Sequence, residues 1–421
     1  MTPIARLVSE CAARALAELD PRARTAEIVR AARPTLRGEV RVVAVGKASV
    51  AMASGALEAL RGARDVDVRA CLVVTPGAAR GVRAGELTST PRTRILRASH
   101  PLPDGRSVAA ARAAMAVARA AGRAASSRES ALVVLVSGGA SSLVAWPAPG
   151  VSLADKRRVT AALLASGAPV TEINTVRRRL SRIKDGGLAR EAGGARVVTV
   201  VLSDVIDGDL SDVGSGPTCA SRAGAHAARK ILARYAPDLV TLPLTPRAAP
   251  ARVARPVAVA SPEQLAERVA RQLEAAGLRA RVLPPSLAAA EDLAREYVRL
   301  ASKLAPGAAI VRVAEPSVEV PHGARAGRGG RSTHVSARVG AGGLPRGVTF
   351  LALATDGVDG SSGTGGALLV GPVTGRARTL LDRASRAFDT GPAHVTLGTA
   401  LPRRPSGHNL ADLHVLARAR G

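Results

Sequence analysis

The sequence predicts an α/β protein of two domains: a Rossmann-like, mainly parallel sheet with helices on both faces, and a second, smaller α/β domain. A chain of 421 residues is too long for one ordinary hydrophobic core. Short apolar runs rich in β-branched residues, such as Val40–Val45 and Leu132–Val136, are typical of strands buried in a parallel sheet. Proline, alanine and leucine dominate 237–256 without clear periodicity, so we expect domains at 1–245 and 246–421.

The composition argues against a nucleic-acid-binding protein, although the formal net charge is +27. Arginines are spread along the whole chain instead of forming a block, and aromatic residues, which stack on bases, make up only 1%. The net field would still favour small anionic substrates.

No apolar run has the length of a membrane span, and a beginning that contains Glu10 and Asp20 does not resemble a secretory signal. Cys11, Cys71 and Cys219 lack the spacing of a zinc site or a disulfide framework. We therefore expect a cytoplasmic protein with no membrane partner.

The first predicted strand, Val40–Val45, runs into Gly46-Lys47 and an alanine-rich helix. This turn is not a P-loop, because Arg41 and Ala48 stand where that motif needs glycine and a hydroxyl residue. A lysine at a helix N-terminus opposes the helix dipole, and a bound anion would resolve the conflict. A solvated lysine is the alternative. Lysine is rare in this chain. Lys156, Lys230 and Lys303 lie in helical charge patterns, where chance explains a lysine in place of an arginine.

Further along, Arg69–Val74 is a second strand candidate, and 99–105 is a loop whose two prolines fix the backbone. His100 in this loop is either a substrate contact or a structural hydrogen-bonding residue. Ser152 with Asp155 resembles a capping box that opens a helix.

The strand Leu132–Val136 ends in the glycine- and serine-rich segment 137–142. Ligands of open α/β sheets lie beyond the carboxyl ends of the strands, so this segment predicts a cradle for a phosphate or carboxylate. An ordinary strand-to-helix turn is equally compatible with these residues.

Two more polar segments follow in the first domain. Arg177, Ser181 and Lys184 have helical spacing and would share one face, either solvated or turned towards an anion. The strand Val197–Leu202 is followed by several acids, which suit Mg²⁺ bound to substrate phosphates.

The second domain alternates helices and strands, and the strand Val348–Ala354 carries Asp356 beyond its carboxyl end. An Asp-Gly turn is the plainer interpretation of that residue. The other predicted elements are a helix from Ser261 to about Gly277, a strand Leu278–Leu283, a helix Leu287–Leu304, a strand Ala309–Val313 and a glycine-arginine loop at 323–331.

Taken together and in order, these segments resemble the bacterial glycerate 2-kinase family, whose carboxyl-terminal part is the MOFRL domain. The resemblance covers nearly the whole chain. The segments that carry it are 45–48, 100–104, 136–139, 172–177 through Lys184, 202–205, 215–218, 329–331, 355–360 and 407–413.

The resemblance implies ATP-dependent phosphorylation of D-glycerate to 2-phosphoglycerate in a cleft between the two domains. Lys47, Arg331 and Asp356 are then the catalytic candidates. Phosphoryl transfer needs charge neutralisation and positioning more than covalent chemistry. Lys47 and Arg331 would stabilise the phosphoryl oxygens, and Asp356 would orient or deprotonate the hydroxyl group or hold a metal.

The resemblance also implies ATP and Mg²⁺, with Asp204 and Asp356 as metal ligands, D-glycerate as the small-molecule substrate, no nucleic-acid partner, and room for a homodimer. The residues that it assigns to nucleotide or substrate binding are Ser137, Gly138, Gly139, Ser141, Ser142, Lys184, Ser215, Gly216, Thr218 and Asn409.

Departures from the family pattern leave the substrate open. Ser332, Thr333 and His334 replace the usual asparagine, glutamine and glutamate after Arg331. His334 would face the same site as Arg331 if a helix begins there, or else lie in the core. The alternatives are a related hydroxy-acid kinase, a hydroxypyruvate reductase, for which we find no nicotinamide fingerprint, and a non-catalytic basic binding protein.

Overall fold

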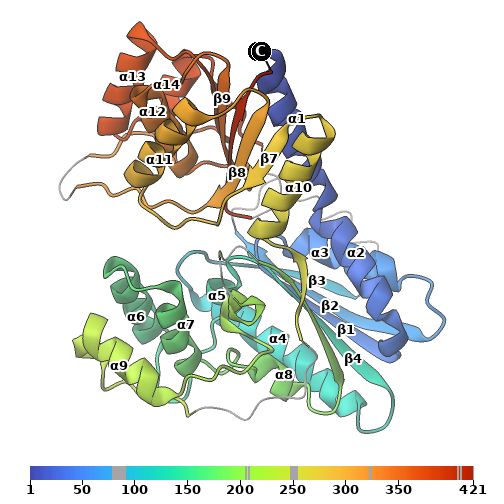
Figure 1. The fold of residues 1–421 in the computed structure, drawn as a ribbon. Helices are drawn as coiled ribbons and strands as arrows, with labels where there is room; N and C mark the ends of the chain where they lie inside the picture. Colours follow the sequence, from blue (N-terminus) through green and yellow to red (C-terminus); the bar gives the residue numbers. More distant parts are fainter. Residues whose placement is uncertain are drawn as a thin grey trace. The chain divides into compact units, whose positions relative to one another are not determined.

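The computed structural model describes residues 1–77, 92–203, 206, 209–246, 255–321, 325–404, 407 and 410–420 (Figure 1). It contains two six-stranded sheets, each with its own helices, which confirms the α/β class. The chain divides into one unit built from 21–203 and 209–259, and another built from 1–20 and 260–420. The predicted domain boundary at residue 245 stays a prediction.

The first sheet is the predicted Rossmann-like one. Its strand order is β3-β2-β1-β4-β5-β6, and β1 pairs in parallel with both β2 and β4. Because the order reverses between β1 and β4, their carboxyl ends open a crevice where ligands bind in such folds. The strands are β1 (Gly38–Val45), β2 (Val66–Pro76), β3 (Thr93–Ala98), β4 (Ser130–Val136), β5 (Arg196–Leu202) and β6 (Val257–Ala260).

Helices cover both faces of this sheet (Figure 1). The predicted capping box is confirmed: Ser152 and Asp155 bond reciprocally at the start of α6. The helices are α2 (Pro21–Ala32), α3 (Ser49–Leu60), α4 (Gly105–Ala124), α5 (Ala140–Leu143), α6 (Leu153–Ala165), α7 (Val170–Arg179), α8 (Gly187–Glu191) and α9 (Ala225–Tyr235).

The predicted helix face shared by Arg177, Ser181 and Lys184 is wrong. Helix α7 ends at Arg179, and Ser181 pairs in a β-bridge with Pro147. That pairing takes the chain out of the helix before Lys184, so Arg177 is placed by α7 and the other two side chains by the loop.

The second sheet has the order β11-β10-β9-β12-β8-β7, with β12 antiparallel to both of its neighbours. Asp412 at the start of β12 therefore lies opposite Ala314 and Ala354, where β8 and β9 end. The strands are β7 (Arg279–Val282), β8 (Ala308–Ala314), β9 (Val348–Ala354), β10 (Gly366–Val370), β11 (Ala400–Leu401) and β12 (Asp412–Arg418).

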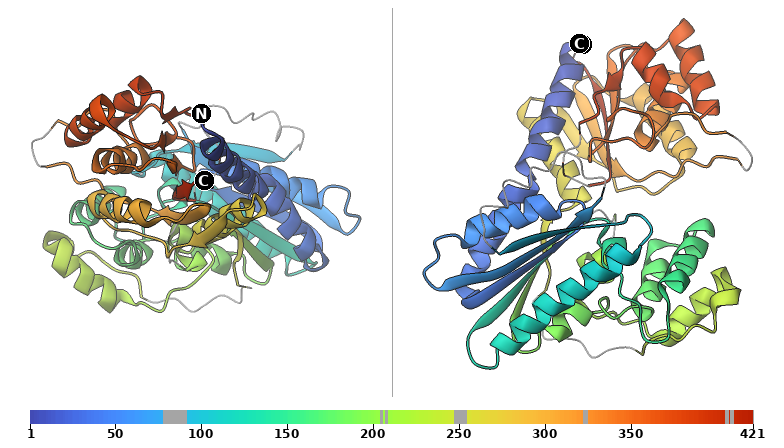
Figure 2. Two further views of the ribbon diagram at one scale, coloured as in Figure 1. Left: turned by 45° about the horizontal axis from the view of Figure 1, so that its top comes forward. Right: turned by 180° about the vertical axis from the view of Figure 1, so that it is seen from behind.

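Helices α11, α12 and α13 pack on one face of the second sheet, and α1 and α10 pack on the other (Figure 2). Tyr297 and Phe350 meet in the core between α11 and β9, with ring centroids 5.0 Å apart. The helices are α1 (Pro3–Glu18), α10 (Pro262–Ala275), α11 (Ala290–Lys303), α12 (Arg331–Gly342), α13 (Gly375–Arg386) and α14 (Thr390–Thr396). Over the described residues, no helix combines the length and apolar character needed to cross a membrane.

Candidate functional site

Two loops join where the order of the first sheet reverses. Ser137 follows β4, and its backbone N–H donates to the Val45 carbonyl of β1 at 2.9 Å. The Ser137 hydroxyl accepts a hydrogen bond from the backbone N–H of Ala48 at 3.1 Å. The predicted ligand contact Ser137 is thus buried and serves to hold the two loops together.

Lys47 lies in this junction beside the predicted cradle. Its backbone N–H donates to Gly138 O at 2.9 Å. Gly139 has φ +83°, and a Cβ there would lie 2.9 Å from His100 Cδ2 and 3.6 Å from Lys47 Cγ. Only glycine leaves room for both side chains in this conformation. Among the described residues, no carboxylate pairs with the Lys47 ammonium group.

The surroundings of His100 favour its neutral form. Burial lowers its pKa, and the positive charges of Lys47 and Arg177 lower it further. The lysine and arginine charges of the junction therefore disfavour a charged imidazole.

Lys184 and the serines of the cradle form one buried network. The Lys184 ammonium group donates to Ser141 O at 2.8 Å and to Gly214 O at 3.3 Å. The hydroxyl groups of Ser141 and Ser215 are 3.0 Å apart, and Ser215 donates to Asn174 Oδ1 at 2.9 Å. Burial holds the pKa of Lys184 well below its ordinary value. Lys184 thus positions the loops that carry the two serines.

The remaining binding candidates of this unit are bonded within the protein. The Ser142 hydroxyl donates to Gly139 O at 3.1 Å. Gly216 O accepts from Gly186 N at 2.8 Å, and the Thr218 hydroxyl accepts from Thr199 at 3.0 Å. Two further candidates, Asp204 and Asn409, lie outside the described residues.

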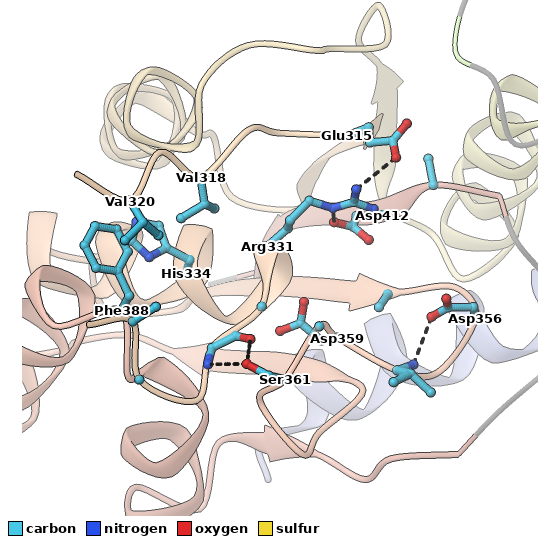
Figure 3. Close-up of a pocket in the computed structure, with 18 of the residues that line it drawn as sticks. Glu315, Val318, Val320, Arg331, His334, Asp356, Asp359, Ser361, Phe388 and Asp412 are labelled. Carbon is cyan, nitrogen blue, oxygen red and sulfur yellow. Dashed lines mark hydrogen bonds and ion pairs between the residues drawn. The ribbon is translucent and has the colours of Figure 1, made fainter. Parts of the chain in front are cut away.

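The second unit contains a cavity of about 410 Å³, which holds Arg331 and Asp356 together (Figure 3). It lies where α12 begins, β9 ends and β12 starts. Figure 3 shows the rings of His334 and Phe388 on one side and Arg331 with its acidic partners on another. The cavity thus has an apolar part and a charged part.

Arg331 bonds two acids, one at the start of β12 and one directly after β8. Its Nε donates to Asp412 Oδ2 at 3.1 Å, and its Nη1 donates to Glu315 Oε1 at 2.9 Å. Burial raises the pKa of Asp412 to about 7 despite the attraction of Arg331, because desolvation penalises the carboxylate more than the guanidinium stabilises it. The two acids raise the pKa of Arg331 against the lowering effect of its burial.

Asp359 has a structural task. Its carboxylate accepts hydrogen bonds from the backbone N–H groups of Ser332 and Thr333, both at 2.9 Å, and so caps α12. A Cβ at Gly330 would lie 2.2 Å from Asp359 Cγ, which explains the glycine before Arg331. Asp356 is half-buried on the cavity wall, and its Oδ1 accepts a hydrogen bond from the Val358 backbone N–H at 2.9 Å.

His334 and Arg331 line the same cavity, as the helical spacing predicts. The His334 Nε2 atom is 3.0 Å from Glu291 Oε1, and its ring stacks on Phe388 at 5.6 Å between centroids. The residue is therefore fixed from α11 while one face of the ring borders the cavity.

The sequence reasoning missed Glu315 and Phe388 in this cavity. Glu315 directly follows β8, so the end-of-strand argument that singled out Asp356 would also have found it. Phe388 is one of two phenylalanines in the chain, and that rarity was an available signal. Within the described residues, no group of three or more His, Cys, Asp or Glu side chains is arranged to hold a metal ion.

Comparison with known proteins gives the family. The model of the domain of unknown function DUF4147 matches residues 7–243, and the MOFRL family model matches 308–412. A protein of Agrobacterium vitis, provisionally named a hydroxypyruvate reductase, is 36% identical over 404 residues, 90% of this chain and 87% of the relative. A D-glycerate 2-kinase of Thermotoga maritima is 36% identical over 194 residues, 46% of this chain and 43% of the relative.

Solved structures agree with the sequence comparisons. The crystal structure of glycerate kinase from Thermotoga maritima has a TM-score of 0.82 and 25% identity, with 99% of both chains covered. A protein from Pyrococcus horikoshii shares the fold, with a TM-score of 0.73 at 21% identity over both complete chains. The chain therefore belongs to the glycerate kinase family whose members join a DUF4147 domain to a MOFRL domain.

Proposed function

We propose that this protein transfers the γ-phosphoryl group of ATP to the 2-hydroxyl group of D-glycerate and forms 2-phosphoglycerate. The observation that carries the proposal is the cationic junction at the carboxyl ends of β1 and β4, where Lys47 flanks Gly139. Phosphoryl transfer is catalysed mainly by positioning and by positive charge, which this junction supplies. The relatives named glycerate kinase support the choice of substrate.

The proposed roles follow from the charges. Lys47 and Arg331 stabilise the transferring phosphoryl oxygens, and Asp356 orients the glycerate hydroxyl group and accepts its proton. Ser141, Ser142 and the backbone of 138–139 form the proposed binding surface for substrate anions. The cleft between the two domains that the family resemblance implies stays a prediction. A homodimer stays a prediction.

Magnesium fits the cavity of the second unit through Asp356. Carboxylate oxygens are the ligands that Mg²⁺ prefers, together with substrate phosphates. Both oxygens of Asp359 accept hydrogen bonds at the start of α12, and Asp412 pairs with Arg331. Asp356 accepts one backbone hydrogen bond, through Oδ1, so we propose that its other oxygen holds the ion. Bound Mg²⁺ would neutralise charge on the nucleotide phosphates. The proposal for Asp204 rests on the family resemblance alone.

The test is a coupled assay for ADP release with D-glycerate, L-glycerate, lactate and hydroxypyruvate as acceptors. We expect ADP release that depends on D-glycerate, and coupling through enolase identifies the 2-phospho product. Nicotinamide oxidation with hydroxypyruvate in the absence of ATP would instead favour the activity named for the Agrobacterium vitis relative.

A further inference from the structure

A second, much smaller cavity lies in the first unit beside the cradle. Its volume is about 20 Å³. Three cations line it from separate segments: Lys156 from α6, Arg177 from α7 and Lys184 from the loop after α7. We call this cavity the Lys156 pocket. None of the described residues that line it carries a carboxylate.

Lys156 is buried, although the sequence around it is that of an ordinary helical lysine. Its side chain is 5% exposed, and its ammonium group donates to one backbone oxygen, Leu180 O, at 3.0 Å. Burial lowers the pKa of Lys156 to about 7, and the charge of Arg177 adds to the effect. A lysine with no acid beside it is costly to bury in its charged form.

Arg177 differs from the two arginines that follow it. Arg178 pairs with Asp212 at 2.6 Å, and Arg179 pairs with Asp185. Arg177 has no hydrogen bond or ion pair with any described residue, yet its guanidinium group is sufficiently buried that its pKa falls below the ordinary value. The helix therefore neutralises two of three consecutive arginines and leaves the third facing the pocket.

Like charges with no carboxylate among the described lining residues are electrostatically unfavourable unless an anion binds. The charges of Lys156 and Arg177 both help to lower the pKa of Lys184, so charging all three groups at once is unfavourable. A bound anion would turn this repulsion into attraction and regain charge-assisted hydrogen bonds. The volume suits one small group, because a cavity of about 10–15 Å³ already holds one water molecule.

We propose that the Lys156 pocket binds the carboxylate of the small hydroxy-acid substrate. A polyphosphate is too large for it, whereas a carboxylate presents two oxygens to three cations. Ser141 and Ser142 belong both to the pocket wall and to the cradle, and His100 responds to the charges of Lys47 and Arg177. Ser142 donates to Gly139 O, and a Cβ at Gly139 would lie 3.6 Å from Lys47 Cγ, so an acid anchored here would be held near Lys47. The identity of the acid rests on the proposed function, whereas anion binding does not.

Binding of D-glycerate in the absence of nucleotide tests the pocket independently of kinase activity. Calorimetric titration of the wild type with D-glycerate should show binding, and Lys156→Met should weaken it about 10- to 100-fold, as expected for a lost charged hydrogen bond. In the kinase assay, the same variant should raise KM for D-glycerate and leave KM for ATP within about twofold. Lys230→Met is the control, since Lys230 is exposed on α9 and should leave both constants unchanged.

Arg177→Gln provides a second variant if Lys156→Met does not fold. It removes a charge that makes no hydrogen bond or ion pair with a described residue, so the melting temperature should stay the same or rise while D-glycerate binding weakens.

Unchanged D-glycerate affinity in a folded variant would overturn the proposal for the Lys156 pocket and leave the kinase proposal standing. If D-lactate binding depends on Lys156 but no ADP is released with D-glycerate, the pocket stands and the kinase proposal fails. A parallel titration uses inorganic phosphate. A carboxylate site would be contradicted if the wild type binds phosphate but not D-glycerate and the variants lose the phosphate binding.

Discussion

The Asp412 carboxylate accepts a hydrogen bond from Arg331 Nε at 3.1 Å, and this contact joins the first residue of β12 to the first residue of α12. Glu315 after β8 holds the other side of the same guanidinium group at 2.9 Å. Three elements distant in sequence thereby fix the orientation of Arg331 at the cavity wall.

Asp412→Asn should change the pH dependence of stability. The folded pKa of about 7 lies above the unfolded value, so the stabilising effect of the protonated group is complete below about pH 4 and is lost as the pH rises through 7. Between pH 5 and 8 the wild type should lose about 2–3 kcal/mol that the variant retains. Urea unfolding at both pH values measures this difference, and parallel losses in both proteins would show that Asp412 stays ionised.

Lys47→Ala should lower kcat about a hundredfold without loss of fold, since one preorganised charge on a transferring group is commonly worth ~3 kcal/mol. Lys47→Arg should recover little of this rate, because the guanidinium group is planar and larger. Initial rates of ADP release measure both variants. Lys303→Ala, at an exposed position of α11, is the control. Full activity of Lys47→Arg would indicate a surface charge with no catalytic part.

Gly139→Ala should impair both stability and activity. The positive φ costs an alanine about 1–2 kcal/mol, and its Cβ would press on the His100 ring. We expect a lower melting temperature and at least a tenfold lower kcat, because the ring and Lys47 must shift. The matched substitution Gly105→Ala meets no atom within 4 Å and should be neutral in both measurements. Equal behaviour of the two variants would remove the steric argument.

His334→Glu should destabilise the second unit, because it places a second carboxylate beside Glu291, whose Oε1 is 3.0 Å from the present ring. The expected loss is about 2 kcal/mol at pH 8, since a buried hydrogen bond is replaced by repulsion. The double variant with Glu291→Gln should recover most of it, which a double-mutant cycle by chemical denaturation would measure. Additive effects would mean that the two side chains do not interact in solution.

Local sequence patterns predicted the parts of the fold that depend on local composition. The runs Val40–Val45 and Leu132–Val136 became β1 and β4 within a few residues, because strands covered on both faces need continuous apolar sequence. The sequence analysis also singled out Gly139, as part of a ligand cradle, and Gly330, as part of a family motif. The structure adds that a Cβ at either position would meet neighbouring atoms.

Partners that come together only through tertiary packing were not predictable in this way. Lys156 has the sequence surroundings of an ordinary helical lysine, and its burial follows from the packing of α6 against α7. Likewise, nothing in the pattern around Lys184 shows that a β-bridge at Ser181 ends the helix early. The catalytic assignments of Lys47, Arg331 and Asp356 remain predictions from the family resemblance and their chemistry.

The central position of β12 constrains the order in which the protein can be assembled during synthesis. This strand is the last of its sheet in sequence, yet it lies between β8 and β9 and pairs with both. Until the ribosome has released the segment through Arg418, β8 and β9 therefore each present an unpaired edge to solvent or to chaperones. Asp412 arrives with the same strand, so a nascent chain cannot complete the bonding of Arg331 before its second sheet closes.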